Sequence, residues 1–226
     1  MITVCLFTAV PVEGVQPKNI AVSKVTSTSA ILVVKADVTA DVSVDYGPAS
    51  GVYNTTITSA AGVRHEILLD GLAPSAAVYY RVTITDSANR ASSTALPEKS
   101  FHTTRAQGQP FCFAVAGDNR PPGNVTSQPA VWNMIAGQME AENLDLALDV
   151  GDVIYGWGTD TAAQNEAKYD GFFAATASLT DSVPLYMTVG NHEWIGAANN
   201  RAGYQREFAL PENNGADAFP GPAPVI

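Results

Sequence analysis

Basic residues, histidine and cysteine are scarce in this chain of 226 residues. Its 12 Lys and Arg residues face 22 Asp and Glu residues, and the resulting formal net charge of −10 argues against binding to a nucleic-acid backbone, which needs a basic surface. The same charge disfavours long-range attraction of phosphate anions. The two cysteines argue against a structural disulfide, because we expect Cys112 inside a buried strand and Cys5 in an amino-terminal leader.

The chain also lacks a hydrophobic run long enough to cross a bilayer as a helix, which takes about 20 residues. Its most apolar stretch, residues 1–12, is too short, so we expect no membrane span. Two interpretations of the leader (residues 1–14) stay open. It is the remnant of a secretory signal, which predicts a secreted or extracytoplasmic protein, or it is an apolar start without fixed structure.

After the leader the chain has a long all-β pattern. Residues 15–104 contain short runs of Val, Ile, Thr and Tyr at the spacing of a β-sandwich, and glycine- and proline-containing turns separate them. The clearest runs are Ile31–Val34, Val42–Tyr46, Glu66–Leu69 and Val78–Thr85. In the last run, alternate residues should point into the core; they are Val78, Tyr80, Val82 and Ile84.

Two segments of this all-β region carry a family resemblance. Leu72-Ala73-Pro74, followed by Tyr79-Tyr80-Arg81-Val82, resembles the corner of a fibronectin type III domain, as in the amino-terminal domain of purple acid phosphatases. Val42-Ser43-Val44-Asp45-Tyr46-Gly47 is similar to the usual third strand of that domain. No tryptophan occurs before Trp132, so we expect an aliphatic residue near Val34 to replace the usual core tryptophan.

Residues 105–110 are typical of a linker, and an α/β pattern follows them. We expect a buried strand over residues 111–117 and then a helix, with Ser127 as its N-cap and Pro129 in its first turn. A second helix is expected over Ala163–Leu179. In the first helix the apolar residues that recur at helical spacing should pack on the sheet; they are Val131, Met134, Ile135 and Met139.

Three glycine-flanked polar blocks each close a short apolar run in this second region. They are Gly117-Asp118-Asn119, Gly151-Asp152 and Gly190-Asn191-His192-Glu193. Such runs predict buried strands, and the spacing between blocks leaves room for crossover helices, so the strands should be parallel. The polar residues then emerge at the carboxyl-end edge of one sheet, where α/β sheets bind ligands. Two carboxylates and an amide oxygen gathered there predict a metal site.

This order of blocks resembles the metallophosphoesterase (calcineurin-like) superfamily, and within it the purple acid phosphatases, because Tyr155 follows Asp152 by three residues. The resemblance implies hydrolysis of small phosphorylated substrates, as phosphate esters, by a two-metal centre. It implies Asp152 as the bridging ligand, Asp118 as a ligand of one ion, Asn191 as a ligand of the other, and Tyr155 as a phenolate ligand. The implied cofactors are two divalent or trivalent metal ions, Fe together with Zn, Mn or Fe.

Several roles keep two interpretations. His192 is similar to the family histidine that contacts the phosphate or donates a proton to the leaving group, or else it orients a ligand. Tyr155 is a metal ligand or an aromatic neighbour of the ligands. Arg120, where many non-purple relatives have a metal-binding histidine, neutralises the substrate or is a solvated loop residue. Glu193 and Asn119 are expected to hold the ligands in place through hydrogen bonds.

One departure from the superfamily bears on activity. Three histidines from later blocks complete its two-metal centre, but this chain has only His65, His102 and His192 and stops at Ile226. His65 and His102 fall in the all-β region and receive no role.

We therefore expect a multidomain chain: an all-β fibronectin III-like sandwich (residues 15–104), followed by the first half of an α/β metallophosphoesterase sandwich (residues 110–226). Catalysis is expected of a longer parent protein. The alternatives are an inactive fragment, a non-catalytic binding module, or a phosphodiesterase of the same superfamily. Monoester and diester substrates are not separated by these residues, and the oligomeric state is left open.

Overall fold

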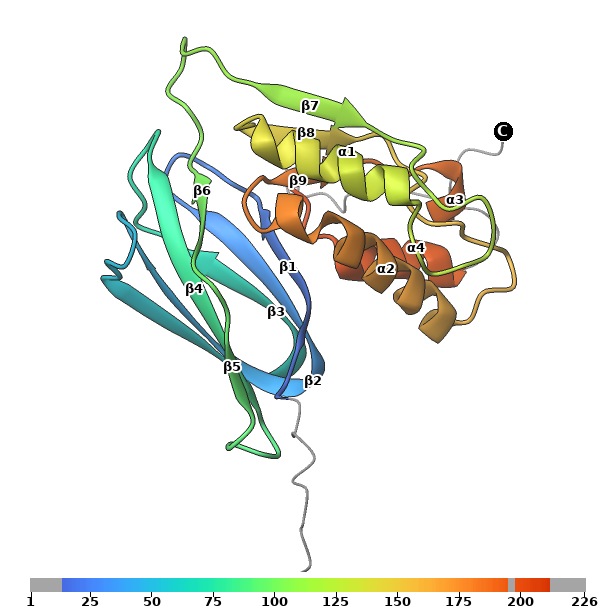
Figure 1. The fold of residues 1–226 in the computed structure, drawn as a ribbon, viewed down its shortest axis with the longest axis horizontal. Helices are drawn as coiled ribbons and strands as arrows, with labels where there is room; N and C mark the ends of the chain where they lie inside the picture. The colour runs from blue at the N-terminus through green and yellow to red at the C-terminus, as the bar shows by residue number, and fades with distance from the viewer. Residues whose placement is uncertain (1–13, 195–197, 212–226) are drawn as a thin grey trace, which may run out of the picture.

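A computed structural model describes residues 14–194 and 198–211, arranged as an all-β unit followed by an α/β unit (Figure 1). The order of the two units agrees with the predicted fold class. Of the predicted leader only Gly14 is described, and Cys5 lies outside the described residues. Among the described residues, no helix is long and apolar enough to cross a membrane.

Six antiparallel strands form the all-β unit. Strand β2 pairs with β1, β3 and β4, and β4 pairs in turn with β5 and β6. The strands are β1 (Pro17–Ser23), β2 (Ala30–Gly47), β3 (Thr55–Leu69), β4 (Ala77–Asp86), β5 (Ser93–Ala95) and β6 (Lys99–His102). Each of these strand pairs thus includes β2 or β4.

β2 joins two runs that the sequence analysis separated. Residues 31–34 and 42–46 belong to one strand, because the polar stretch between them stays extended on the solvent side and shifts the β2–β3 register between Lys35 and Ala40. Such a bulge bends the strand without ending it. The first part of β2 therefore pairs with β1 and the last part with β4.

Aliphatic side chains make up most of the sandwich core. We expected an aliphatic residue near Val34 in place of the usual core tryptophan. Leu32 and Val34 of β2 are both fully buried in this core. The inward alternation predicted for β4 is confirmed, since Val78, Tyr80, Val82 and Ile84 are all buried. The unit consequently has an apolar core of its own.

The α/β unit contains a three-stranded parallel sheet in the order β7-β8-β9, as the block spacing predicted. Its elements are β7 (Phe113–Ala116), α1 (Ala130–Ala141), β8 (Leu146–Asp149), α2 (Ala162–Thr180), β9 (Leu185–Met187), α3 (Asn191–Trp194) and α4 (Ala198–Glu207). α2 begins and ends within one residue of the predicted range, and a capping box between Thr161 and Gln164 fixes its start.

A strand does form within residues 111–117, but the prediction that its side chains are buried is wrong. Phe113 and Val115 are 49% and 59% exposed, and Cys112 is exposed as well. β7 lies at the edge of the sheet, and only its alternate residues Ala114 and Ala116 pack against the helical core. The opposite face of β7 has no covering element within the described residues, which leaves its large side chains in solvent.

The first helix also differs from its prediction. It begins after Pro129, which is the N-cap without a side-chain hydrogen bond, so Ser127 is not the cap. Val131, Met134 and Ile135 are exposed, while the buried face contains Trp132, Ala136 and Met139. Trp132 stacks on Phe172 of α2 with ring centroids 6.3 Å apart, so contact with α2 decides which face is buried.

The two units pack together through β1 and α2 (Figure 1). Thr180 of α2 donates a hydrogen bond to the Ile20 carbonyl at 3.0 Å, and Tyr80 donates to the Asp181 carbonyl at 2.5 Å. A buried ion cluster adds to this contact: Lys35 Nζ lies 2.7 Å from Asp170 Oδ1, 3.0 Å from Glu166 Oε1 and 3.2 Å from Glu207 Oε2. The sandwich therefore touches both α2 and α4.

Candidate metal centre

The three polar blocks follow the carboxyl ends of β7, β8 and β9, so they meet at one edge of the sheet. Asp118 and Asp152 both adopt left-handed backbone conformations, with φ of 52° and 58°. This region is costly for residues other than glycine, although Asp and Asn tolerate it best. β7 and β8 are thus each followed by a tight turn at the predicted ligand.

Glycines let the second and third blocks approach each other closely. A Cβ atom on Gly190 would lie 2.2 Å from Asp152 Oδ1, and one on Gly151 would lie 2.3 Å from the Gly190 nitrogen. Neither distance is possible for a real side chain, so both positions require glycine. The glycines in these two blocks are therefore required by the close packing of the two turns.

Backbone hydrogen bonds tie the three blocks together. The Asp118 N–H donates to the Gly151 carbonyl at 2.9 Å, and the Arg120 N–H donates to the Asp152 carbonyl at 3.0 Å. The His192 N–H donates to Asp152 Oδ1 at 2.8 Å. These bonds bring the predicted residues Asp118, Asp152, Asn191 and His192 into one group of neighbouring turns.

Glu193 binds the second block to the third. Its buried carboxylate accepts hydrogen bonds from the backbone N–H groups of Asp152 and Gly190 at 2.8 and 2.9 Å, and from those of Val153 and Ile154 at 2.9 and 3.2 Å. Burial raises the pKa of Glu193, and the backbone donors partly offset that effect. This carboxylate holds the backbone around two predicted ligands.

Asp149 is a residue of this edge that the sequence analysis did not select. It is the last residue of β8 and is buried, and its carboxylate accepts from the Gly151 N–H at 2.9 Å and from Asn119 Nδ2 at 2.7 Å. Burial raises its pKa, against the lowering by these two hydrogen bonds. The available signal was a carboxylate near the end of the apolar run, two residues before Gly151.

Tyr155 and His192 lie against each other, with ring centroids 4.7 Å apart, and Trp157 stacks on Tyr155 at 5.8 Å. His192 Nδ1 lies 3.0 Å from the Gly156 carbonyl, so Nδ1 carries a proton and donates there. The other ring nitrogen, Nε2, is the position left for a ligand or for proton exchange.

The guanidinium of Arg120 lies beside both carboxylates. Its Nε is 3.5 Å from Asp118 Oδ1 and 3.7 Å from Asp152 Oδ2, and its Cζ is 5.2 Å from the centre of the Tyr155 ring. Because one nitrogen atom lies near both Asp118 Oδ1 and Asp152 Oδ2, the two carboxylates are close neighbours. The Asp118 side chain is 75% exposed and that of Asp152 is 14% exposed, so the pair faces solvent from one side.

The donor set at this edge fits a hard metal ion. Carboxylates, an amide oxygen and a phenol oxygen are ligands that suit hard divalent and trivalent ions. Within the described residues, no three His, Cys, Asp or Glu side chains form a metal-binding group. The fit therefore depends on Asn191 and Tyr155 in addition to Asp118 and Asp152.

The remaining histidines are part of the sandwich. His65 is buried, with Nδ1 2.9 Å from Ser59 Oγ and Nε2 3.1 Å from the Gly62 carbonyl. His102 is an exposed residue of β6. Neither is brought to the edge that carries the three blocks.

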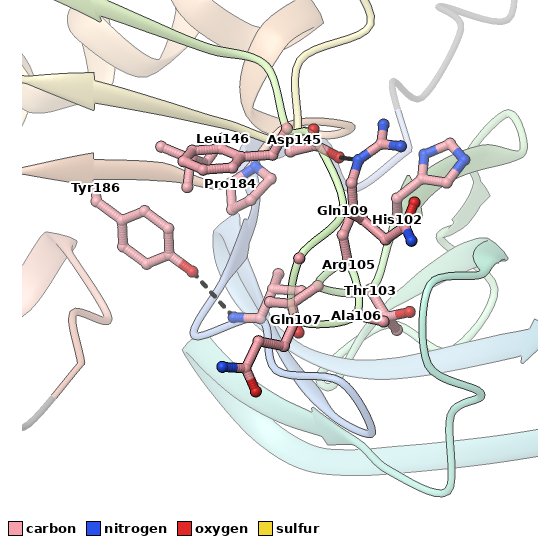
Figure 2. Close-up of a pocket in the computed structure, with 14 residues that line it drawn as sticks. His102, Thr103, Arg105, Ala106, Gln107, Gln109, Asp145, Leu146, Pro184 and Tyr186 are labelled. Carbon is pink, nitrogen blue, oxygen red and sulfur yellow. Dashed lines mark hydrogen bonds and ion pairs between the residues drawn. The ribbon is translucent and has the colours of Figure 1, made fainter.

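A cavity of about 320 Å³ lies elsewhere, at the junction of the sandwich, the linker and the sheet (Figure 2). Its walls include Leu146 and Pro184, at the amino ends of β8 and β9, and Tyr186, whose hydroxyl accepts from the Val25 N–H at 3.1 Å. None of the predicted site residues lines it. This cavity thus lies at the edge of the sheet opposite the candidate metal centre.

Comparison with known proteins supports the same family. A sequence profile described as "Calcineurin-like phosphoesterase" matches residues 112–224, half of the chain. Purple acid phosphatase 15 of Arabidopsis thaliana is 28% identical over 185 residues, which cover 74% of this chain and 32% of the relative. The chain therefore spans about a third of the length of that curated relative.

Two solved structures have a similar fold. The structure of PhoD has a TM-score of 0.67 and 15% identity, over 92% of this chain and 49% of that chain. The purple acid phosphatase PPD1 from yellow lupin (Lupinus luteus) seeds has a TM-score of 0.64 and 17% identity, over 89% of this chain and 42% of that chain. At these identities the likeness concerns the fold alone. Together with the profile match over the three blocks, it leads to one conclusion: the chain belongs to the calcineurin-like phosphoesterase family.

Proposed function

We propose that this chain contributes Asp118, Asp152, Tyr155 and Asn191 to a two-metal centre that hydrolyses phosphate esters, as an acid phosphatase does. One observation carries the proposal: three strand-end turns are bonded to one another so that these residues share one edge of the sheet. Family membership supports phosphoester hydrolysis in general. The proposed substrate is a small phosphorylated molecule.

Each residue has a part in this chemistry. When bound, two metal ions lower the pKa of a water molecule and neutralise the phosphoryl oxygens. Asp152, with Oδ1 fixed by the His192 N–H, would bridge, and Asp118 and Asn191 would each serve one ion. His192, oriented through Nδ1 by the Gly156 carbonyl, would hold or release a proton at Nε2 toward the leaving-group oxygen.

The proposed metals are Fe together with Zn, Mn or Fe, and Tyr155 is the reason. A phenolate oxygen favours a hard, highly charged ion such as Fe(III). The iron-loaded protein should then show a visible charge-transfer band from phenolate to iron that disappears in Tyr155→Phe. A colourless, fully active, iron-free protein would place it among the relatives without a tyrosine ligand.

Substitution of the bridging residue tests the whole proposal. In a longer protein that also carries the later histidine ligands, Asp152→Ala should abolish metal binding and the turnover of p-nitrophenyl phosphate together, because both ions depend on one carboxylate. Asp45→Ala is the control, since Asp45 pairs with Arg81 on the sandwich surface. Near-normal activity of Asp152→Ala would refute the assignment.

The number of ligands that this chain offers to the proposed metal ions decides which protein should show activity. This chain offers no later histidine for the proposed ions, so we expect turnover only from a protein that also carries those ligands. Multiple-turnover phosphatase activity of residues 1–226 would contradict this part of the proposal. The proposed secreted or extracytoplasmic location rests on the apolar residues 1–12 alone.

A further inference from the structure

Arg120 occupies a place that the proposed ligand set does not explain. Its guanidinium faces three of the four proposed ligands, at 3.5 Å from Asp118 Oδ1, 3.7 Å from Asp152 Oδ2 and 5.2 Å from the centre of the Tyr155 ring. The two N–O distances suit ion pairs but exceed those of hydrogen bonds. Charge and the aromatic face therefore hold this group, rather than directional bonds.

Hydrogen bonds fix the backbone of Arg120 but not the Nε atom of its side chain. The Arg120 N–H donates to the Asp152 carbonyl, and the Asp118 N–H donates to the Gly151 carbonyl. Nε is buried and finds no hydrogen-bond partner in the part of the chain that the structure describes. Movement of the guanidinium would break no hydrogen bond at that atom and would leave the turn in place.

The local charges explain why a cation is held there. Asp118 and Asp152 direct carboxylate oxygens at the same guanidinium, and two like charges so close repel each other unless a positive charge faces both. Lys168 is the neighbouring cation, but its buried Nζ already donates to the Tyr155 carbonyl at 2.8 Å and to Asp160 Oδ2 at 2.6 Å. Arg120 is thus the counter-charge of the two aspartates.

Asp152 Oδ1 already accepts from the His192 N–H, so the oxygen of Asp152 left for a metal ion is Oδ2, which faces Arg120. We propose that Arg120 is an internal cation that holds these two carboxylates together and that a metal ion must displace, so that Arg120 sets the metal affinity of the site. The inference rests on the proposed function, because it takes the two carboxylates as ligands. It gives Arg120 a role in regulating metal loading.

Calorimetric titration of Mn²⁺ into the whole 226-residue chain tests this without any need for turnover. Arg120→Met and Arg120→Gln remove the charge while keeping a long side chain. Loss of two ion pairs and a cation–π contact at a partly exposed site predicts that both variants bind Mn²⁺ about tenfold more tightly than the wild type. The control Arg105→Met removes an arginine that pairs with Asp145 at the opposite edge of the sheet, and it should bind like the wild type.

The outcomes separate this inference from the proposed function. Binding by the wild type with equal or weaker binding by both neutral variants would overturn the role of Arg120 and leave the metal centre standing. Binding by the neutral variants alone would support it, because the wild-type guanidinium would then be the obstacle. Failure of every protein to bind, with native circular dichroism spectra, would overturn the inference, because Asp118 and Asp152 would then hold no ion in this chain. The proposed function would still be tested by Asp152→Ala in a protein that also carries the later histidines.

Discussion

Replacement of Lys35 by methionine should destabilise the contact between the sandwich and the α/β unit. Lys35 is 3% exposed and lies within 3.2 Å of carboxylate oxygens of Asp170, Glu166 and Glu207. Burial lowers the pKa of Lys35, but the hydrogen bonds and charges of these acids outweigh that effect and raise it. Methionine fills a similar volume without the charge, so three acidic groups would remain together at the contact.

The expected cost follows from what each acid keeps. Removing one partner of a buried ion pair typically costs about 3–5 kcal/mol. Asp170 retains Lys18 at 2.8 Å, Glu207 retains Arg206 at 3.0 Å, and the Glu166 side chain is 39% exposed and can be hydrated. We therefore expect the lower end of the range, about 3 kcal/mol at pH 7.

Urea unfolding followed by circular dichroism measures this cost, with Lys18→Met as the matched control. Lys18 is 40% exposed and pairs only with Asp170 among the described contacts, so its loss should cost about 1 kcal/mol or less. If Lys35→Met were as stable as Lys18→Met at pH 7, the reasoning about the buried cluster would be refuted.

Two further predictions concern the edge that carries the three blocks. Glu193→Gln should lower the free energy of unfolding by about 3 kcal/mol or more. The reason is that an amide NH₂ group would face backbone N–H donors that now bond a buried carboxylate. Urea unfolding measures this cost, with the exposed residue Glu66 changed to Gln as the control. Asp149→Asn tests the sign of a pH dependence. The folded-state pKa of Asp149 is raised by burial, so its contribution to wild-type stability is full below about pH 4 and is lost as the pH rises through the folded pKa. The stability of the wild type minus that of Asp149→Asn should therefore fall between pH 4 and pH 7, and a constant difference would contradict the raised pKa.

The sequence predicted the elements of this protein better than their burial. Alternation on β4 and the range of α2 depend on the local sequence, and both predictions are confirmed. The strand at residues 111–117 and the helix after Pro129 were assigned buried faces from their apolar residues alone. Phe113, Val115 and Met134 are nevertheless exposed, because the position of α2 and the edge position of β7 decide what is covered.

The candidate site divides in the same way. The sequence by itself determined that Asp118, Asp152 and Asn191 follow three parallel strands, since glycine-bounded apolar runs and crossover spacing are local and topological facts. It could not show that Glu193 collects four backbone N–H groups, that Asp149 holds Asn119, or that Arg120 faces two carboxylates. These contacts join residues from different turns, and only the tertiary structure decided them, because a hydrogen bond or ion pair depends on distances between atoms that the folding of separate strands brings together.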